Sequence, residues 1–386
     1  MQNRDQGRKV DMKKTYEEIQ EKIKRGKAVV LTAEEMTDFV SENGTKKAAK
    51  EVDVVTTATF GAMCSSGAFL NLGHANPPTK YQKITLNHVP AYGGIAAADM
   101  YIGVTERSEV SDEYGGGHVI EDLIAGENID FSAHGLSTDC YTGKKVSGQI
   151  NIKDINNAFL LNPRNAYQNY ACATNTSRKT LYTYMGTLLP NMGNISFSSC
   201  ASLSPLINDP TYRTIGIGTR IFIAGTQGFI VNYGTQHCPS NETNAGTVFT
   251  MGDMKKMNSS YLRAATFPGY GISLYIGIGV PIPVLDEEIA KSTAIKDSEI
   301  ETVVYDYSVK SLKKPVIARF NYAELYKGEV EIKGKKISVG ALSSRRKARD
   351  IALKLKKMIK AGSFLVSKPA ETLRQDTKFH PLKLKK

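Results

Sequence analysis

Two cysteines of this 386-residue chain lie in sequence surroundings that suit a reactive thiol. Cys64 follows an apolar, β-branched run and is itself followed by Ser65, Ser66 and Gly67. Small residues leave backbone N–H groups free to bind a substrate anion, and a helix beginning at Ser65 would favour the thiolate through its dipole. Free cysteines are also commonly buried structural residues, so both interpretations stay open for Cys64.

The second candidate, Cys140, lies in the polar segment Ser137–Gly143, between Asp139 and Tyr141. A cysteine among hydroxyl groups and a carboxylate is rarely part of a hydrophobic core. We therefore predict that Cys140 is exposed and reactive, as a nucleophile or sulfur carrier must be. The other three cysteines lack comparable surroundings, and we predict structural or incidental roles for them: Cys172, Cys200 and Cys238.

Three consecutive glycines end at Gly117 and precede a helix that we expect to begin at His118. Free amides of Gly116 and Gly117 would bind a substrate carboxylate or another anion there. The pattern is neither G-x-G-x-x-G nor a Walker loop, so it gives little support to nucleotide binding, and a tight turn is the alternative. His118 is the histidine best placed for proton transfer, ahead of His74 and His237.

The segment Asn162–Tyr170 is dense in rigid hydrogen-bonding side chains, which are costly to bury without partners. Arg164 would hold a substrate carboxylate in a bidentate fork, with Asn165 beside it. A solvated turn with a helix cap is the alternative interpretation. We predict that four further stretches line a cleft: Tyr184–Asn194, Arg213, Arg220 and Phe267–Ala290.

The elements that must position these residues begin with an alternation of helices and strands. The pattern predicts a helix over Lys14–Arg25, a strand over Ala28–Leu31 and a strand over Val52–Thr59. Between the strands, Thr32 and Glu35 form a capping box that opens another helix. This alternation favours an α/β fold with a mixed, partly parallel sheet, in which ligands bind beyond the carboxyl ends of strands. The first candidate cysteine falls at such an end.

The rest of the chain predicts short strands joined by Gly-rich loops, over Gly61–Gly279. Lys291–Asp297 is a polar break that we interpret as a linker. After it we predict a strand over Ile300–Val309, a hairpin over Val330–Val339 and a basic amphipathic helix over Ser343–Lys360. Together these form a small basic C-terminal α+β element. We divide the chain into a polar tail, a catalytic domain and a basic hairpin–helix extension: 1–13, 14–290 and 298–386.

The net charge of +12 is concentrated in the C-terminal part of the chain. Residues 313–386 hold 21 Lys and Arg against 6 Asp and Glu, whereas the remainder holds 29 against 32. Such a segment would attract RNA or an acidic protein, but basic runs of this kind are more often the solvated face of a helix. We therefore expect an acidic protein partner or a solvated helix, and no nucleic acid.

Cysteine usage and hydropathy indicate a cytoplasmic protein. Five cysteines with no C-x-x-C pair argue against a zinc ribbon and against a secreted disulfide framework. Every apolar run is interrupted well before the roughly 18 residues that a membrane span requires, and the N-terminal residues have no signal-peptide pattern. We expect reduced thiols and no membrane partner.

Eight stretches follow one another in an order that is highly specific. They are VDVVTTATFGAMCSSGAFLN, PAYGGIAAADMYIG, YGGGHVIEDLIAG, TDCY, AFLLNPRNAYQNYACATN, YTYMGTLLPNMGN, LINDPTYRTIGIGTRIF and FPGYGISLYIGIGVPIPVLDEEIA. The combination closely resembles the homocysteine-biosynthesis family of anaerobic archaea and bacteria, long described as a domain of unknown function. The resemblance covers roughly Thr15–Ala290 and continues in the stretch NYAELYKGEVEIKGKKISV.

The resemblance implies an L-aspartate semialdehyde sulfurtransferase that makes homocysteine, with Cys64 and Cys140 as the family cysteines. Our hypothesis is that Cys140 carries sulfur as a persulfide, whose outer sulfur attacks the aldehyde. Cys64 would assist as a resolving thiol or second carrier. Amides near Ser65, Gly67, Gly116 and Gly117 would stabilise the oxyanion, Arg164 would hold the α-carboxylate and His118 would move protons.

The resemblance also implies a sulfur donor and a small ferredoxin-like reductant protein, since turning an aldehyde carbon into a thiol consumes electrons. No cofactor is certain, and no metal site is predicted. An iron–sulfur cluster, on a partner or held by Cys64 and Cys140, is a competing chemistry that the sequence leaves open, as it does a homo-oligomer. Two rival functions are a CoA or acyl transferase with Glu121 as nucleophile, and an RNA-binding or tRNA-thiolating protein using the basic segment.

Overall fold

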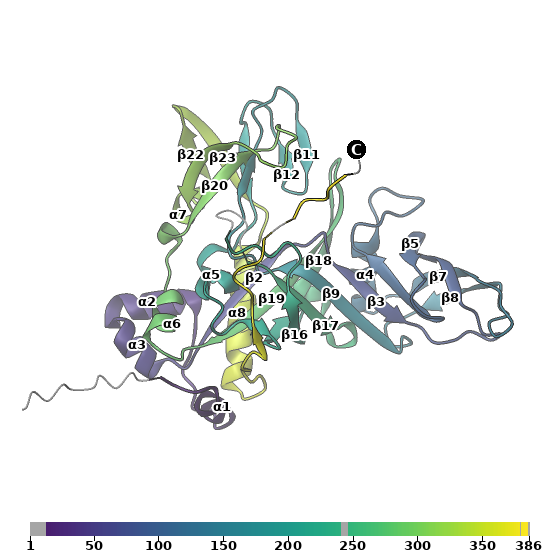
Figure 1. The fold of residues 1–386 in the computed structure, drawn as a ribbon, viewed down its shortest axis with the longest axis horizontal. Coiled ribbons are helices and arrows are strands. Elements are labelled where there is room, and N and C mark those ends of the chain that lie inside the picture. Colours follow the sequence, from purple (N-terminus) through teal and green to yellow (C-terminus); the bar gives the residue numbers. More distant parts are fainter. Residues whose placement is uncertain (1–12, 241–245, 379, 385–386) are drawn as a thin grey trace, which may run out of the picture.

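The computed structural model describes residues 13–240, 246–378 and 380–384. A large sheet runs along the molecule and a smaller sheet stands on it. Helices from the N-terminal part of the chain lie at one end of the large sheet (Figure 1). The predicted polar tail 1–13 lies outside the described residues except for Lys13. The predicted α/β class with a mixed, partly parallel sheet is confirmed.

The N-terminal alternation of helices and strands is present as the sequence predicts. The Thr32 side chain accepts a hydrogen bond from the backbone N–H of Glu35, and the Glu35 carboxylate accepts one from the backbone N–H of Thr32. This capping box satisfies two amide groups at the start of a helix that have no partner inside it. Three helices belong to this region: α1 (Tyr16–Lys24), α2 (Ala33–Asn43) and α3 (Thr45–Glu51).

The large sheet is mostly antiparallel, with β1 and β2 running parallel at one edge. In spatial order its path is β1 (Val30–Thr32), β2 (Val54–Ala62), β19 (Gly271–Pro283), β15 (Arg220–Ile223), β16 (Thr226–Tyr233), β17 (Val248–Asp253), β9 (Asn157–Asn165), β3 (Gly67–Asn71), β6 (Asp99–Gly103), β5 (Val89–Tyr92), β4 (Tyr81–Leu86), β7 (Ile129–Gly135) and β8 (Lys145–Ile150). Strand β18 (Leu262–Phe267) pairs with β19 beside this path.

The smaller sheet has six strands and two parallel pairs, β10 with β20 and β13 with β23. Its order is β21 (Val316–Asn321), β20 (Glu301–Asp306), β10 (Cys172–Thr174), β13 (Asn194–Phe197), β23 (Lys335–Ala341) and β22 (Glu329–Ile332). The predicted hairpin is confirmed, since β22 and β23 turn at Lys333 and Gly334, both with positive φ. Two short pairs complete the strands: β11 (Leu181–Thr183) with β12 (Gly186–Leu188), and β14 (Gly216–Ile217) with β24 (Glu371–Thr372).

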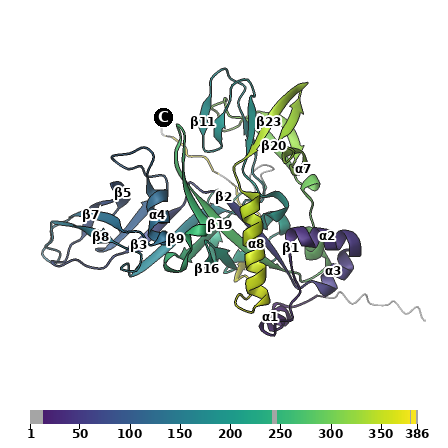
Figure 2. The same cartoon turned by 180° about the vertical axis from the view of Figure 1, so that it is seen from behind.

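The basic C-terminal helix α8 (Arg345–Lys360) lies across β1, β2 and β19, toward one edge of the large sheet (Figure 2). Its apolar stripe is fully buried as predicted: Ala348, Ile351, Ala352, Leu355 and Ile359. A Cβ on Gly277 would lie 2.7 Å from Ile351 Cδ1, so the glycines of β19 allow the helix to approach closely. Burying a Leu or Ile side chain contributes roughly 1.5–3 kcal/mol. The C-terminal segment therefore shares its hydrophobic core with the large sheet.

The strands from β3 to β8 form a lobe that extends away from the small sheet and the N-terminal helices (Figure 1). Helix α4 (Gly116–Ala125) packs into this lobe through Val119, Ile120 and Leu123, all fully buried. The remaining helices are α5 (Pro205–Asn208), α6 (Glu287–Ser292) and α7 (Tyr322–Leu325). The interpretation of Lys291–Asp297 as a polar linker is wrong in one respect, because the segment contains the end of α6 and its Thr293 is buried in the fold.

Candidate active site

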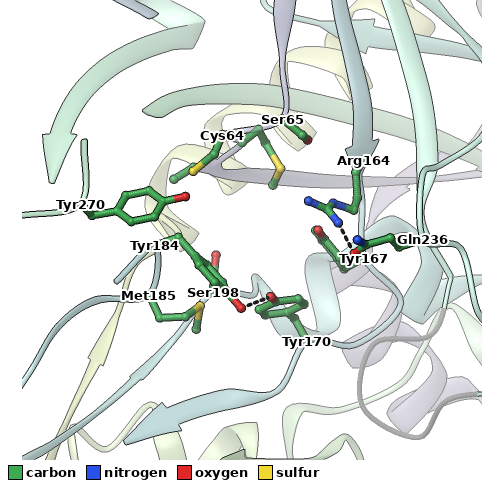
Figure 3. Close-up of a pocket in the computed structure, with 12 residues that line it drawn as sticks. Cys64, Ser65, Arg164, Tyr167, Tyr170, Tyr184, Met185, Ser198, Gln236 and Tyr270 are labelled. Carbon is green, nitrogen blue, oxygen red and sulfur yellow. Dashed lines mark hydrogen bonds between the residues drawn. The ribbon is translucent and has the colours of Figure 1, made fainter. Parts of the chain in front are cut away.

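Cys64 lies in the turn between β2 and β3, two strands that lie far apart in the order of the large sheet. No helix begins at Ser65, because strand β3 starts two residues later, so the predicted helix dipole is not available to the thiol. The Cys64 Sγ atom lies 3.2 Å from the Ser273 hydroxyl oxygen. The Tyr270 hydroxyl points into the same cavity beside Cys64 (Figure 3). Two hydroxyl groups from the region of β19 therefore flank one half-buried thiol.

The thiol faces a cavity of about 310 Å³ between the large sheet and the β11–β12 hairpin (Figure 3). Its lining residues come from turns at the ends of β2, β9, β13, β16 and β18, and from the hairpin itself. They are Ala62, Met63, Cys64, Ser65, Arg164, Tyr167, Tyr170, Tyr184, Met185, Ser198, Gln236 and Tyr270. Among these described residues there is one guanidinium and no carboxylate, so the cavity suits a small anionic ligand.

Arg164 lies across the cavity from Cys64, at the end of β9 (Figure 3). One terminal nitrogen of its guanidinium donates a hydrogen bond to the side-chain oxygen of Gln236. Its Nε atom is buried and has no hydrogen-bond partner among the described residues. Because an unpaired buried N–H is costly, this atom is ready to donate to a bound carboxylate. Arg164 thus lines the cavity, and its role in holding a carboxylate stays a prediction.

Tyrosines form much of the remaining wall. The Tyr170 hydroxyl donates to the Tyr184 hydroxyl over 3.0 Å, and Tyr184 in turn lies 2.8 Å from the Tyr307 hydroxyl. Burial raises the pKa of Tyr167 to about 12. The pKa of Tyr270 is also raised, mainly by burial and then by the neighbouring Cys64. The Tyr167 and Tyr270 phenols therefore stay protonated near neutral pH and can donate hydrogen bonds.

Cys140 lies in the exposed loop between β7 and β8, which confirms the predicted exposure. Its Sγ atom is 3.6 Å from the Thr138 hydroxyl oxygen. Thr138 also accepts a hydrogen bond from the backbone N–H of Tyr141, whose ring stacks on His74 at a centroid distance of 5.8 Å. Cys140 is thus presented on an ordered turn, and it does not line the Cys64 cavity.

The sheet topology keeps Cys64 and Cys140 of one chain apart. Cys64 precedes β3 and Cys140 follows β7, with β6, β5 and β4 between those two strands. Four strand spacings of about 4.8 Å amount to roughly 19 Å. The strand direction reverses at each of the four steps, so β3 and β7 run in the same direction. The start of β3 and the end of β7 therefore lie at opposite ends of the strands. A cluster shared by both thiols of one chain does not fit this arrangement.

His118 lies away from the Cys64 cavity. It lines a shallow surface depression beside Glu121 and Arg263, and its Nδ1 accepts a hydrogen bond from the backbone N–H of Gly115. Burial lowers the pKa of His118, and nearby carboxylates, which raise it, offset only part of this effect. Glu121 accepts a hydrogen bond from the backbone N–H of Ala264, which gives it a structural partner. The structure thus separates the predicted proton carrier from the candidate thiols.

The glycine amides that were predicted to bind anions have partners inside the fold. The N–H of Gly116 donates to the Glu106 carbonyl and that of Gly117 to the Val104 carbonyl. Gly67 pairs within the sheet, where a Cβ would collide with the Tyr101 hydroxyl at 2.2 Å. These three glycines therefore serve close packing in the structure.

Ser65 and Asn165 have different surroundings. Ser65 lines the Cys64 cavity. Asn165 is fully buried beside Arg164, where its side-chain oxygen accepts a hydrogen bond from the N–H of Ala166 and its Nδ2 has no partner among the described residues. Ser198 and Gln236 are cavity residues that sequence reasoning missed, because no local motif marks them.

The other candidate residues have structural partners. Cys172 and Cys200 are fully buried, and burial raises the pKa of the Cys172 thiol to about 12. His237 is held at both ring nitrogens, accepting from the Thr247 amide and donating to the Arg374 carbonyl. Arg213 forms an ion pair with Asp286, and Arg220 donates to the Leu365 carbonyl. Neither arginine lines the Cys64 cavity. In contrast, the predicted cleft loops at Tyr184 and Tyr270 do line it.

A half-buried thiol facing a guanidinium across a hydroxyl-lined cavity is suited to covalent chemistry on a small carboxylic acid. The profile of the family described as "Homocysteine biosynthesis enzyme, sulfur-incorporation" matches residues 28–366. The chain belongs to this family.

Two relatives carry a specific enzyme name. The L-aspartate semialdehyde sulfurtransferase of Methanosarcina acetivorans is 53% identical over 366 residues, which are 95% of this chain and 73% of the relative. The enzyme of the same name from Methanocaldococcus jannaschii is 49% identical over 376 residues, or 93% of this chain and 73% of that protein.

An uncharacterised protein of Methanothermobacter thermautotrophicus is 30% identical over 81% of this chain and 72% of its own length. No solved structure matches the chain. Among the described residues, no helix is long and apolar enough to cross a membrane. The described residues also contain no group of three or more His, Cys, Asp or Glu side chains arranged to hold a metal ion.

Proposed function

We infer that this chain is an L-aspartate semialdehyde sulfurtransferase, which transfers sulfur to L-aspartate semialdehyde and releases L-homocysteine. Two relatives about half identical over more than nine tenths of the chain bear this name. The structural observation that supports the inference is the cavity in which Cys64 and Arg164 face each other. We propose a cytoplasmic setting, where thiols are kept reduced.

In this proposal the semialdehyde binds in the Cys64 cavity. The α-carboxylate receives hydrogen bonds from Arg164, whose buried Nε lacks a partner among the described residues and whose orientation is held by Gln236. The aldehyde carbon then points to Cys64. The Tyr270 hydroxyl donates to the aldehyde oxygen while negative charge develops there. We assign this proton donation to Tyr270 because His118 lines a different depression.

Sulfur enters through Cys140, whose exposed thiolate attacks the outer sulfur of a donor persulfide. The bond between that sulfur and the donor breaks, the donor leaves as a thiolate, and Cys140 becomes the persulfide. Cys64 is the second carrier, since it is the thiol in the cavity. The outer sulfur on Cys64 forms a bond to the aldehyde carbon, and the oxygen leaves as water after protonation. One electron pair reduces the carbon and a second cleaves the sulfur–sulfur bond, which regenerates the Cys64 thiolate and releases homocysteine. A small ferredoxin-like protein carrying an iron–sulfur cluster would supply these electrons.

The test is to incubate the purified protein anaerobically with L-aspartate semialdehyde, a persulfide as sulfur donor and a low-potential reductant, and to detect homocysteine by mass spectrometry. Homocysteine should form in proportion to enzyme, and omission of either substrate should abolish it. A matched reaction uses the Arg164→Gln variant, which keeps both thiols. If the wild-type protein forms no homocysteine with the reductant protein supplied, the proposed function is wrong.

A further inference from the structure

We propose that sulfur passes between two copies of this chain, with the Cys140 loop of one copy docking at the Cys64 cavity of the other. The Cys140 loop is defined as residues 136–144. The inference rests on the proposed function, in which both thiols carry sulfur. It adds that each active site is built from two chains.

The first argument is geometric. A thiolate that attacks a persulfide must come within bonding distance of its outer sulfur. The strand order separates Cys64 from Cys140 by roughly 19 Å, and the two residues lie at opposite ends of the strands. The Cys140 loop is also tied to its own lobe. The N–H of Gly143 donates to the Pro78 carbonyl over 3.0 Å, and the N–H of Leu136 donates to the Lys80 carbonyl over 2.9 Å. A second copy supplies the contact without dismantling the lobe.

The second argument is electrostatic and begins at the Cys140 loop. Lys144 at the end of the loop and Lys145 directly after it are both exposed, and the backbone of the half-exposed Lys80 is hydrogen-bonded to the loop. Asp139 is the single carboxylate within the loop. Leu136 adds an apolar contact, since 51% of its surface is exposed. The end of the lobe that presents Cys140 is therefore basic, with an unpaired apolar side chain.

The surface next to the Cys64 cavity has the opposite charge. We call residues 105–113 the acidic rim, because Glu106, Glu109, Asp112 and Glu113 are all exposed there against the single cation Arg107. The rim is fixed to the wall of the cavity. Arg107 donates to the Tyr270 carbonyl over 2.9 Å, and Thr266 donates to the Glu113 carbonyl over 2.9 Å.

The two surfaces are complementary in charge and in polarity. Val110, in the middle of the acidic rim, is 71% exposed and can pack against an incoming apolar side chain. Opposite charges steer association and fix the register of docking. In a dimer related by a two-fold axis, each Cys140 loop meets the acidic rim of the other copy. One closed dimer then contains two identical composite sites.

The transfer between the two thiols is balanced without any added oxidant or reductant. The Cys64 thiolate of one copy attacks the outer sulfur of the Cys140 persulfide of the other copy. A bond forms between Cys64 Sγ and the outer sulfur, while the bond from that sulfur to Cys140 Sγ breaks. The electron pair of the broken bond stays on Cys140, which leaves as a thiolate ready to accept sulfur again.

The decisive experiment uses heterodimers with two different affinity tags, one chain carrying Cys64→Ser and the other Cys140→Ser. Tandem purification isolates dimers in which one composite site keeps both thiols and the other has none. With two identical sites per wild-type dimer, about half of the wild-type rate is expected. Matched controls are doubly tagged dimers with Cys64→Ser in both chains or Cys140→Ser in both chains, each expected to be inactive at low sulfur-donor concentration.

Four results would overturn the proposal. They are failure to isolate any heterodimer, an inactive heterodimer, full activity of either homogeneous variant, and full activity of a wild-type protein that is monomeric in the assay by mass photometry. None of these touches the proposed function, because wild-type homocysteine formation is measured in parallel. Absence of homocysteine from the wild type would instead reject the proposed function.

A charge-reversal pair tests the docking surfaces separately. Lys144→Glu with Lys145→Glu should reduce kcat/KM for the sulfur donor roughly tenfold, because like charges then face each other. Adding Glu109→Lys and Asp112→Lys to the same chain should restore most of the lost rate. The control is Lys354→Glu with Lys357→Glu on the exposed side of α8, which should leave the rate unchanged. If the combined variant is no better than the lysine variant alone, the surfaces do not meet.

Discussion

Cys64 and Cys140 are the same residue type in two opposite environments. Cys64 is half-buried between two hydroxyl groups, in a cavity that also holds Arg164. Cys140 is exposed on a turn held by Thr138, among lysines. A thiol that lines a cavity is suited to act on a small bound substrate, whereas an exposed thiol is suited to receive sulfur from a donor. Cys140 is therefore suited to capture sulfur from a donor, and Cys64 is suited to pass it to the substrate.

The largest effect is expected from removing the exposed thiol. Cys140→Ser should abolish sulfur transfer at low donor concentration, because serine cannot form a persulfide. Cys64→Ser should impair it more variably, since excess sulfide can reach an open cavity. Alkylation with mass mapping should modify Cys140 first, Cys64 more slowly and the buried Cys172 last, even at pH 9, since burial raises the pKa of Cys172 to about 12. If Cys140 reacted slowest and its serine variant stayed active, the division of roles would be wrong.

The next effect concerns the guanidinium of the cavity. Arg164→Gln removes a charge-assisted hydrogen bond to the substrate carboxylate, which is worth about 1.5–3 kcal/mol, or roughly 10–100-fold in kcat/KM. The loss should appear mainly as a higher KM for L-aspartate semialdehyde, with loading of Cys140 by the sulfur donor unchanged. The control is Arg178→Gln, which removes an exposed guanidinium outside the cavity. Equal losses in both variants would argue against carboxylate binding at Arg164.

A smaller effect is expected for the phenol beside Cys64. Tyr270→Phe removes one neutral donor to the aldehyde oxygen, worth about 1 kcal/mol or somewhat under tenfold in rate. Because the pKa of Tyr270 is raised, the wild-type phenol stays protonated, so the rate should show no fall due to this group between pH 7 and 9. The loss should appear in kcat and not in KM. The control is Tyr182→Phe, whose side chain is 52% exposed on the adjacent hairpin.

The sequence predicts the local features of both regions better than the contacts between distant segments. The capping box at Thr32, the hairpin turn at Gly334 and the buried stripe of α8 depend on near neighbours, and all are confirmed. The exposure of Cys140 follows from its polar neighbours and is also confirmed. In these cases, the physical cause lies within one turn of helix or one strand.

The contacts that build the cavity depend on sheet register, which a single sequence does not reveal. Arg164 meets Gln236 across 72 positions, and Cys64 meets Ser273 across 209. The prediction that the glycine run binds an anion failed for the same reason. The amide of Gly116 is free only if no carbonyl lies near it, and it donates to the Glu106 carbonyl. Contacts between residues far apart in the sequence therefore determine which of the predicted site residues line the cavity.

The smallest effect is expected from the buried cysteines, which test whether the comparison between Cys64 and Cys140 is specific. Cys172→Ser and Cys200→Ser each place a hydroxyl in a fully buried site, so each should lower the free energy of unfolding by about 1–3 kcal/mol, with no direct effect on the reaction. Denaturant titration measures the first quantity and homocysteine formation per folded molecule the second. At 25 °C both variants should keep most of the wild-type rate, because neither residue lines the cavity or the Cys140 loop. A variant that is stable yet inactive would show that a third thiol takes part in sulfur transfer, and the two-thiol comparison would then have to be abandoned.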